Sequence, residues 1–552
     1  MGDFGHGFVG RRESAFTSLL PVRAASYSAK ALFDLSVAMK GDVDVVKDGP
    51  DPEENILVPA GYTYFGQFID HDLTFDSTSS LDPSKPADPS NTRTPKFDLD
   101  CVYGDGPDAQ PFLYDPDGEK LLMRNVAPTA GATDPAAQDL FRNPNGRAII
   151  GDKRNDENSI VSQIQLAFIK YHNAVVDALA KLDPNSWNVA GSLFVSARNE
   201  VRWTYQKLVV EDFLRRIVRA EVLQGLDGKS LTERARNYAL FTEDKRGNLP
   251  REFVAAAYRF GHSGVRTGYR MNAGLANRFD IFPASNDATK KAGADSLLGF
   301  DPVTNNQVID SWERFFPMSL PGVLPSEDRS SAADETPNGA VRLQFAYKID
   351  PTLVDPLGVL PRMPVAGDGT TKEAEKDIAP ATLPDTIGDP PRPSLALLNL
   401  LRGDAYRIPS GQAVAAALQQ AGFDCKVVED DALATRQPGA AKGTFKFVKI
   451  AHELRRETPL WFYVLAEAQE PLVKHFGHHE FHEEKLLTGI GAKTQLGWVG
   501  GRIVAEVFYG LLDSDPTSYV HAAPAGWKPM LGPAAAPLVF RSMLKVADPT
   551  DA

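Results

Sequence analysis

The sequence of 552 residues contains only two cysteines, Cys101 and Cys425. Two cysteines exclude a disulfide framework and any cluster held by several thiolates. One disulfide stays open, although two free thiols are the simpler interpretation. No apolar run approaches the ~20 residues of a membrane-spanning helix. The first 12 residues are polar and glycine-rich and lack the apolar segment of a Sec signal. These absences favour a cytoplasmic protein, with export by a non-Sec route left open.

Positive charge is also scarce. The chain has 59 Lys and Arg against 72 Asp and Glu, which gives a net charge of -13. A broad nucleic-acid surface needs concentrated Lys and Arg, so nucleic acids and anionic membranes are not expected partners. Hydrophobic residues make up 43% of the chain and charged residues 24%, as in ordinary globular proteins. The length requires several domains or one large helical body.

Helical periodicity dominates the chain. In residues 160–179 apolar side chains recur at i, i+3 and i+4, the pattern of an amphipathic helix. Further helices are expected at residues 193–218, 251–260, 412–420, 460–468 and 499–512. Residues 76–95, 104–144 and 320–393 carry turn signals instead, and we expect the last segment to wrap over the surface. The predicted fold class is mainly α: a single large helical domain with long irregular loops and few short strands.

Two histidines in helical settings carry the first chemical signal. Gln67 and His71 are four residues apart, so a helix places them on one face, while Asp70 and Asp72 flank the histidine and point elsewhere. His262 follows a glycine at the end of a helical run. A lone histidine on an apolar helix is usually a core residue, but flanking carboxylates favour a functional role. Two such histidines suit a haem between them, because the iron takes one histidine and the open face needs a base.

Two polar segments are less specific. Residues 151–158 precede the helix at 160, so Asn158 or Ser159 is predicted to cap it. Residues 94–104 alternate oxygen donors, which suits Ca²⁺, although an ordinary Asp-rich turn is more common.

Taken together, these segments resemble the animal-type haem peroxidase family, the peroxidase–cyclooxygenase superfamily, and specifically its bacterial members. The matching segments occur in the family's order between about residues 61 and 516. We expect an N-terminal extension at 1–55 that wraps the core, a haem peroxidase catalytic domain at 56–520, and a C-terminal tail at 521–552.

The resemblance assigns the distal side of a haem b. The family's Gln-x-x-Asp-His-Asp motif stands at 67–72, which makes His71 the distal base and Gln67 part of the halide and water site. The family's Gly-Asp-x-Arg-x-x-Glu motif stands at 151–157, which makes Arg154 the distal arginine. Asp70 and Glu157 match the carboxylates that form esters with haem methyl groups.

A calcium site and the proximal side follow in the same way. The resemblance implies calcium ligands from Asp72, Thr94, Lys96 (through its carbonyl), Asp98 and Asp100. The proximal motif at 258–262 makes His262 the axial ligand of the haem iron and Arg259 a propionate partner. Asn399 would accept the Nδ1–H of His262, and Arg402 would be a second propionate partner.

Two departures narrow the implied activity. Asn158 stands where mammalian members carry the methionine of a sulfonium link, so that link is excluded. Arg259 stands where cyclooxygenases carry their radical-forming tyrosine, which counts against fatty-acid oxygenation. The resemblance implies a haem peroxidase that reduces H₂O₂ through an oxyferryl intermediate and oxidises small anionic or aromatic donors, namely halide, thiocyanate or phenols. The alternatives are a fatty-acid dioxygenase of the same superfamily, or a non-catalytic haem-binding or adhesion protein.

A histidine-rich segment near residue 480 is a separate candidate. Histidines at 475, 478, 479 and 482 would share one face if residues 474–485 were helical. That spacing can bind Zn²⁺ or Ni²⁺, but a solvated polar face is more typical.

Overall fold

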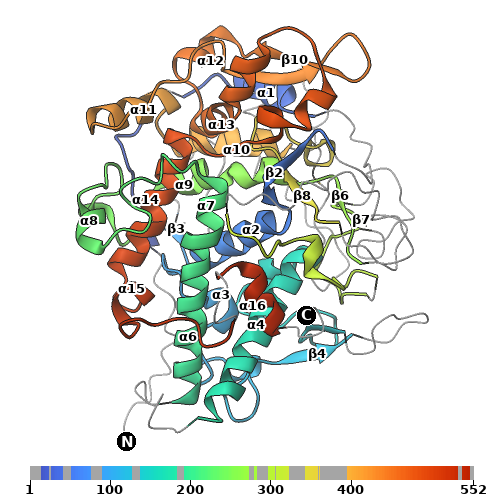
Figure 1. Cartoon of the computed structure of the whole chain (residues 1–552), viewed down its shortest axis with the longest axis vertical. Coiled ribbons are helices and arrows are strands. Elements are labelled where there is room, and N and C mark those ends of the chain that lie inside the picture. The colour runs from blue at the N-terminus through green and yellow to red at the C-terminus, as the bar shows by residue number, and fades with distance from the viewer. Residues whose placement is uncertain are drawn as a thin grey trace, which may run out of the picture.

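The computed structural model describes residues 14–23, 26–41, 51–75, 90–126, 137–182, 192–272, 279–282, 296–304, 306–321, 342–358, 360, 394–532 and 538–547. Helices dominate these residues and the strands are short, which confirms the predicted fold class (Figure 1). None of the described helices is long and apolar enough to span a membrane. Both cysteines are buried and free, as predicted.

Helix α4 confirms the strongest periodic pattern in the sequence. It spans Ser159–Leu179, and the side-chain oxygen of Asn158 accepts the Ile160 amide, so Asn158 is the predicted N-cap. Its residues are buried along most of its length, where it packs against α2 (Gly61–Leu73) and α6 (Leu193–Leu208). Phe168 of α4 stacks on Phe68 of α2 with ring centroids 4.7 Å apart. This packing fixes the position of α2, which carries His71.

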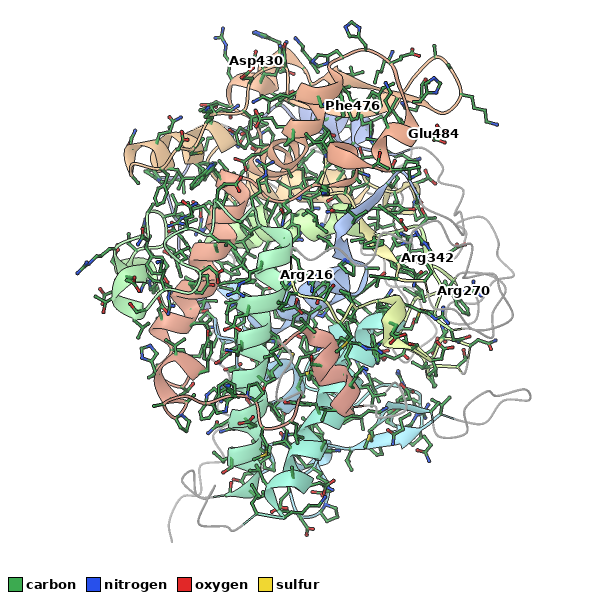
Figure 2. All side chains as sticks on the ribbon, viewed as in Figure 1. Arg216, Arg270, Arg342, Asp430, Phe476 and Glu484 are labelled. Atoms are coloured by element: carbon green, nitrogen blue, oxygen red, sulfur yellow. The ribbon has the colours of Figure 1, made fainter. Side chains whose placement is uncertain are left out.

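The predicted long helix at 193–218 is one continuous run with a bulge. Helix α6 passes through a π-helical turn, Val209–Phe213, into α7 (Leu214–Ile217). Within the turn, Asp212 is buried and pairs with Arg216 at 2.8 Å. Figure 2 shows Arg216 near the middle of the molecule. Asp212 also accepts the hydroxyl of Tyr62 at 2.5 Å, which ties α2 to this turn.

The predicted helix at 251–260 is shorter than expected. Helix α9 covers only Arg251–Ala255, because Ala256 leaves helical geometry with φ -138° and ψ -71°. A 3-10 helix, η6, follows at Ala257–Gly264 and carries His262. The hydroxyl of Tyr258 donates to the carbonyl of Gly66 in α2 at 3.1 Å, so η6 is tied to the helix that carries His71.

The remaining helices surround this centre. Helices α11 (Gly411–Gln420), α13 (Leu460–Phe476) and α14 (Trp498–Ser514) confirm three further predictions, and α13 is longer than expected. The others are α1 Ala29–Ala38, α3 Asp100–Tyr103, α8 Leu231–Ala235, α10 Leu395–Ala405, α12 His452–Arg456, α15 Tyr519–Ala522 and α16 Phe540–Ala547.

The described strands form small antiparallel sheets. Strand β2 (Glu54–Pro59) pairs with β8 (Phe345–Tyr347), and β10 (Thr444–Lys449) lies between β9 (Ala434–Pro438) and β11 (Phe481–His482). The other pairs are β1 Ser14–Ala15 with β3 Ser90–Asn91, β4 Met123–Asn125 with β5 Gln138–Leu140, and β6 Gly268–Tyr269 with β7 Phe279–Asp280.

Part of the segment predicted to wrap the surface is instead buried. Most of 320–393 lies outside the described residues, but β8 is buried and Tyr347 is 4% exposed. The pattern missed this strand because it is short and lies in a proline-rich context. Residues 76–89 of the other predicted loop also lie outside the described residues.

Residues 474–485 do not form the continuous helix that a shared histidine face would require. Helix α13 ends at Phe476, because Gly477 takes a positive φ of 66°. His482 belongs to strand β11, so the four histidines do not share a helix face. Figure 2 shows Phe476 and Glu484 at the edge of the molecule, far from its middle. The described histidines form no grouping that could hold a metal ion.

The C-terminal segment packs into the body of the protein. Phe540 of α16 lies 4.3 Å from Phe65 of α2, measured between ring centroids, and is buried. In Figure 1 α16 lies beside α4. The division into an extension, a catalytic domain and a tail stays a prediction.

Candidate functional site

A cavity of about 350 Å³ is lined by residues of both α2 and the 3-10 helix η6. Its polar lining includes Gln67, Asp70, His71 and Glu157, and, from η6, Arg259 and His262. Apolar side chains such as Val58, Ile217, Ile281, Phe282, Ile349 and Leu357 complete the wall. This size and this mixture of apolar walls with a few polar groups are typical of cofactor and small-molecule sites.

On the α2 wall, His71 and Gln67 share one face, as their spacing predicts. His71 is 4% exposed. Its Nε2 lies 3.5 Å from a carboxylate oxygen of Glu157, and the amide of Gln67 donates to the same oxygen at 2.5 Å. Asp70 also lines the cavity and accepts a hydrogen bond from the Thr74 hydroxyl at 3.1 Å. Three of the predicted distal residues therefore surround the histidine ring.

The other nitrogen of His71 meets a residue that the sequence analysis did not single out. Nδ1 lies 2.7 Å from Oδ1 of Asn155, and the Asn155 amide nitrogen donates to Gln165 Oε1 at 2.8 Å. Asn155 and Gln165 are both 0% exposed. The sequence analysis treated residues 151–158 as a polar run before a helix. Nothing in one sequence separates a residue behind a histidine from an ordinary capping residue.

Arg154 does not line the cavity. Its guanidinium donates to the carbonyl of His71 at 3.1 Å and to the carbonyl of Thr74, at the C-terminal end of α2. It also pairs with Asp152 at 2.8 Å and lies 4.7 Å from the centre of the Phe75 ring. A cation beside the last carbonyls of a helix is favourable. The structure therefore places the Arg154 guanidinium at the C-terminal end of α2. The predicted distal role would instead place it in the cavity.

On the wall formed by η6, His262 is held by a side-chain amide. The Asn399 amide nitrogen lies 2.8 Å from Nδ1 of His262, while Asn399 Oδ1 accepts from Arg259 at 3.4 Å. This leaves Nε2 as the ring nitrogen available to a ligand. Burial, together with smaller repulsions by Arg259 and Arg402, lowers the pKa of His262 to about 3. The imidazole is neutral at physiological pH, the form that ligates iron.

The two arginines of this wall differ in position. Arg259 lines the cavity and donates through Nε to the carbonyl of Val254 at 2.8 Å. Arg402 lies on α10, close enough to influence the pKa of His262, but is not among the cavity residues.

Behind the distal wall, Asp72, Asp98 and Asp100 form an acidic cluster. One oxygen from each carboxylate lies within 4.8 Å of the others. Asp72 is 0% exposed, and neither of its oxygens has a close hydrogen-bond partner among the described residues. Burial raises the pKa of Asp72 well above its usual value, and the charges of Asp98 and Asp100 also raise it. Leu99 and Tyr205 lower this pKa, but by less. A buried unpaired carboxylate beside two others fits a hard cation such as Ca²⁺.

The other predicted calcium ligands lie in the same loop. The Thr94 hydroxyl donates to Asp98 at 2.8 Å, and Lys96 pairs through Nζ with Asp515 at 2.9 Å, which leaves its carbonyl as the group a cation would use. Leu99 adopts a positive φ of 56°, a conformation that is strained for a branched side chain. Strain of this kind is typical of functional loops, and here it lies between Asp98 and Asp100.

Gly151 lets the two motifs approach each other. A Cβ at this position would lie 2.6 Å from the carbonyl oxygen of Cys101 and 2.7 Å from that of Asp100. The segment that carries Asn155 and Glu157 can therefore lie directly against the acidic loop.

Comparison with known proteins agrees with this arrangement. Residues 77–308 match the family model for animal haem peroxidases, a range that includes Glu157 and His262 but begins after His71. Human dual oxidase 1 is 27% identical over 255 residues, 41% of this chain and 15% of its own length. Canine dual oxidase 1 is 29% identical over 177 residues, 29% of this chain and 11% of its own length. The chain thus spans only a small part of these relatives.

A solved structure shares the whole fold. Peroxidase A from Dictyostelium discoideum superimposes with a TM-score of 0.55 and 13% sequence identity, covering 98% of this chain and 94% of its own. The two proteins therefore share their overall fold. The family-model match assigns residues 77–308 to the animal haem peroxidase family, and the solved structure shows a shared fold.

Proposed function

We propose that this protein is a haem peroxidase that reduces hydrogen peroxide and oxidises halide, thiocyanate or small phenolic donors. One observation carries the proposal: two histidines from separate elements, His71 of α2 and His262 of η6, line one and the same cavity. The haem, when bound, supplies an iron that takes a peroxide oxygen and accepts its oxidising equivalents. The residues of the chain supply the rest.

His262 is the proposed iron ligand. Its ring is neutral, and its Nε2 is free of the bond that Nδ1 makes with Asn399. Ligation through Nε2 leaves the ring proton on Nδ1, so we expect the Asn399 amide to turn and present Oδ1 to that proton. This outer contact fixes the ring and raises its basicity. Arg259 and Arg402 are the proposed partners of the haem propionates.

His71 is the proposed carrier of the peroxide proton. Its Nε2 faces the cavity, where it can take a proton from one peroxide oxygen and return it to the other, which leaves as water. Gln67 is within reach of the same space and is proposed to shape the halide and water site. Arg154 is proposed to hold the C-terminal end of α2 in place, because its guanidinium contacts carbonyls there.

Asp70 and Glu157 remain the proposed ester-forming residues. Both line the cavity, which such links to haem methyl groups require. We also propose Ca²⁺ as a second cofactor, held by Asp72, Asp98, Asp100, the Thr94 hydroxyl and the Lys96 carbonyl. The unpartnered oxygens of Asp72 support that site.

A fatty-acid dioxygenase is the second candidate. Tyr258 and Tyr347 both line the cavity, so tyrosines are present although position 259 is arginine. The hydroxyls of both are occupied, Tyr258 by the Gly66 carbonyl and Tyr347 by Asp51 at 2.8 Å. Oxygen uptake with a long-chain fatty acid, measured beside the peroxidase assay, separates the two activities. The presence of both histidines argues against a non-catalytic haem-binding or adhesion protein.

The deciding experiment is an optical titration of the full chain with haemin, followed by a few equivalents of H₂O₂ and acid–organic extraction. We expect one haem per chain, a spectrum that changes with peroxide and recovers on adding bromide, thiocyanate or a phenol, and haem that then resists extraction. A chain that takes up no haem, or a haem that does not react with peroxide, would refute the proposed function. Complete extraction would refute only the ester links.

A further inference from the structure

We propose that Asn155 is a positioning residue that fixes the orientation and the tautomer of His71, so that an unprotonated Nε2 faces the cavity. The inference rests on the proposed function, because it concerns the histidine assigned there as the proton carrier. It starts from a contact to a residue that lies behind the ring and does not line the cavity.

The contact is short and enclosed. His71 Nδ1 and Asn155 Oδ1 are 2.7 Å apart, and the two residues are 4% and 0% exposed. A buried polar atom without a partner costs free energy, so each of these groups depends on the other. Water is not available to replace either partner without opening the packing between α2 and α4.

The direction of this hydrogen bond follows from the next residue in the chain of contacts. The Asn155 amide nitrogen is used by Gln165, to which it donates at 2.8 Å. Its oxygen therefore faces His71, and an amide oxygen only accepts hydrogen bonds. In this orientation of the two amides, Nδ1 of His71 is the donor.

The consequence appears at the other side of the ring. A neutral imidazole carries one proton, so a proton held on Nδ1 leaves a lone pair on Nε2. Nε2 points toward Glu157, whose nearest oxygen lies 3.5 Å away and already accepts from Gln67. His71 Nε2 and the Glu157 carboxylate are thus two hydrogen-bond acceptors close to each other. Such a pair suits a ligand that donates a proton, such as hydrogen peroxide.

One short segment provides both sides of this arrangement. The 3-10 helix η2 spans Lys153–Asp156, and Glu157 is its C-cap. Asn155 therefore contacts Nδ1 of His71, while Glu157 lies on the Nε2 side of the ring. If Asn155 were only a buried structural link between α2 and α4, it would not favour one tautomer of His71 over the other. The test must separate these two roles.

The experiment measures which ring nitrogen of His71 carries the proton, by ¹⁵N NMR of histidine-labelled full-length protein. The haem-loaded chain is studied in its diamagnetic ferrous carbon monoxide form, and the chain as purified is used if it binds no haem. The His71 signal is assigned by its loss in His71→Gln. The variants are Asn155→Leu, which removes the acceptor; Asn155→Asp, which keeps an oxygen there; and Gln165→Leu, which frees the Asn155 amide to rotate.

We expect the proton on Nδ1 in the wild type and in Asn155→Asp, and a mixture of tautomers in Asn155→Leu and, to a smaller extent, in Gln165→Leu. The rate of reaction with peroxide should fall about 10- to 100-fold in Asn155→Leu and recover in Asn155→Asp. The matched control is Asn173→Leu, which removes a buried asparagine of α4 whose side-chain amide is bonded to the backbone of Leu121. It should leave the tautomer unchanged.

An unchanged Nδ1 proton in Asn155→Leu would overturn the inference, and so would an equal shift in Asn173→Leu. If Asn155→Leu does not fold, Gln165→Leu and Asn155→Asp still decide the question. A chain that binds no haem would refute the proposed function, while the tautomer measured in that chain would still test the role of Asn155.

Discussion

The two histidines of the cavity are held alike but surrounded differently. Each has an asparagine at Nδ1: Asn155 behind His71 at 2.7 Å and Asn399 behind His262 at 2.8 Å. Both asparagines are 0% exposed. The similarity ends there, because Asn155 presents an oxygen and Asn399 presents its nitrogen.

Charge separates the two walls. Carboxylates of Asp70 and Glu157 line the cavity near His71, whereas Arg259 and Arg402 lie near His262. Burial and the two cations keep the pKa of His262 at about 3, so that ring is neutral at physiological pH. The surroundings of the two histidines therefore support the proposed division, iron ligation by His262 and proton transfer by His71, and four measurements can break or sharpen this contrast.

The largest effect is expected from replacing the histidines themselves. His71→Leu should keep haem but slow the reaction with peroxide by about 10²- to 10⁴-fold, the contribution of a general acid–base group. His262→Leu should instead lose haem. Stopped-flow rates and haem content after gel filtration separate the two outcomes. Equal haem loss in both variants would show that the walls have no division of roles.

Removing the cation behind the distal wall should come next. A cation that binds only the folded chain at 100 times its Kd stabilises it by about 2.7 kcal/mol, so a chelator should lower the melting temperature. Asp72→Asn should abolish this sensitivity, because it removes one of the three carboxylates proposed to hold the cation.

The control for the cation is a carboxylate on the surface. Asp430 has a 63% exposed side chain, and Figure 2 shows it at the periphery. Asp430→Asn should respond to the chelator as the wild type does. A wild type whose melting temperature ignores both calcium and chelator would leave the acidic cluster without a cation.

Asn399 tests the proximal wall. Asn399→Leu should accelerate haem loss about 10- to 100-fold, because a ligating histidine depends on its outer hydrogen bond. Asn399→Asp keeps an acceptor for the Nδ1 proton and should lose haem more slowly than the leucine variant. Transfer of haem to apomyoglobin measures both rates. Faster loss from Asn155→Leu than from Asn399→Leu would invert the assignment of the two walls.

The smallest effect concerns a third histidine, His172, which is buried away from the cavity. Burial lowers its pKa from 6.5 to about 4, although the Glu119 carbonyl partly offsets this. Between these values the unfolded chain binds more protons than the folded chain, so stability is full above pH 6.5 and declines as the pH falls toward 4. The loss between pH 7 and 5 is about 2 kcal/mol.

His172→Gln should remove that loss, because a neutral amide can donate to Glu119 and accept from the Tyr103 hydroxyl, as the ring does. Urea unfolding of both proteins at pH 7 and pH 5 gives the difference, in which other titrating groups cancel. An identical pH dependence in the two proteins would show that burial alone does not keep this ring neutral.

Several elements could be predicted because their signals are local. The apolar spacing of residues 160–179 predicts α4, and the side chain of Asn158 predicts its start, since both depend only on neighbours within a few turns. The spacing of Gln67 and His71 likewise predicts a shared face. Gly477 ends α13 after Phe476, so the histidines at 475–482 do not share the helix face that their spacing alone would allow.

The sequence by itself determined a mainly helical chain without a disulfide framework and the residue types available for haem and cation binding. Tertiary structure alone decided that Asn155 contacts His71, that Arg154 donates to a carbonyl at the C-terminal end of α2, and that β8 is buried. The reason is physical: periodicity and capping are local properties of the chain. Hydrogen-bond partners 80 or more residues apart depend instead on how the helices pack, and so does the charge around each histidine.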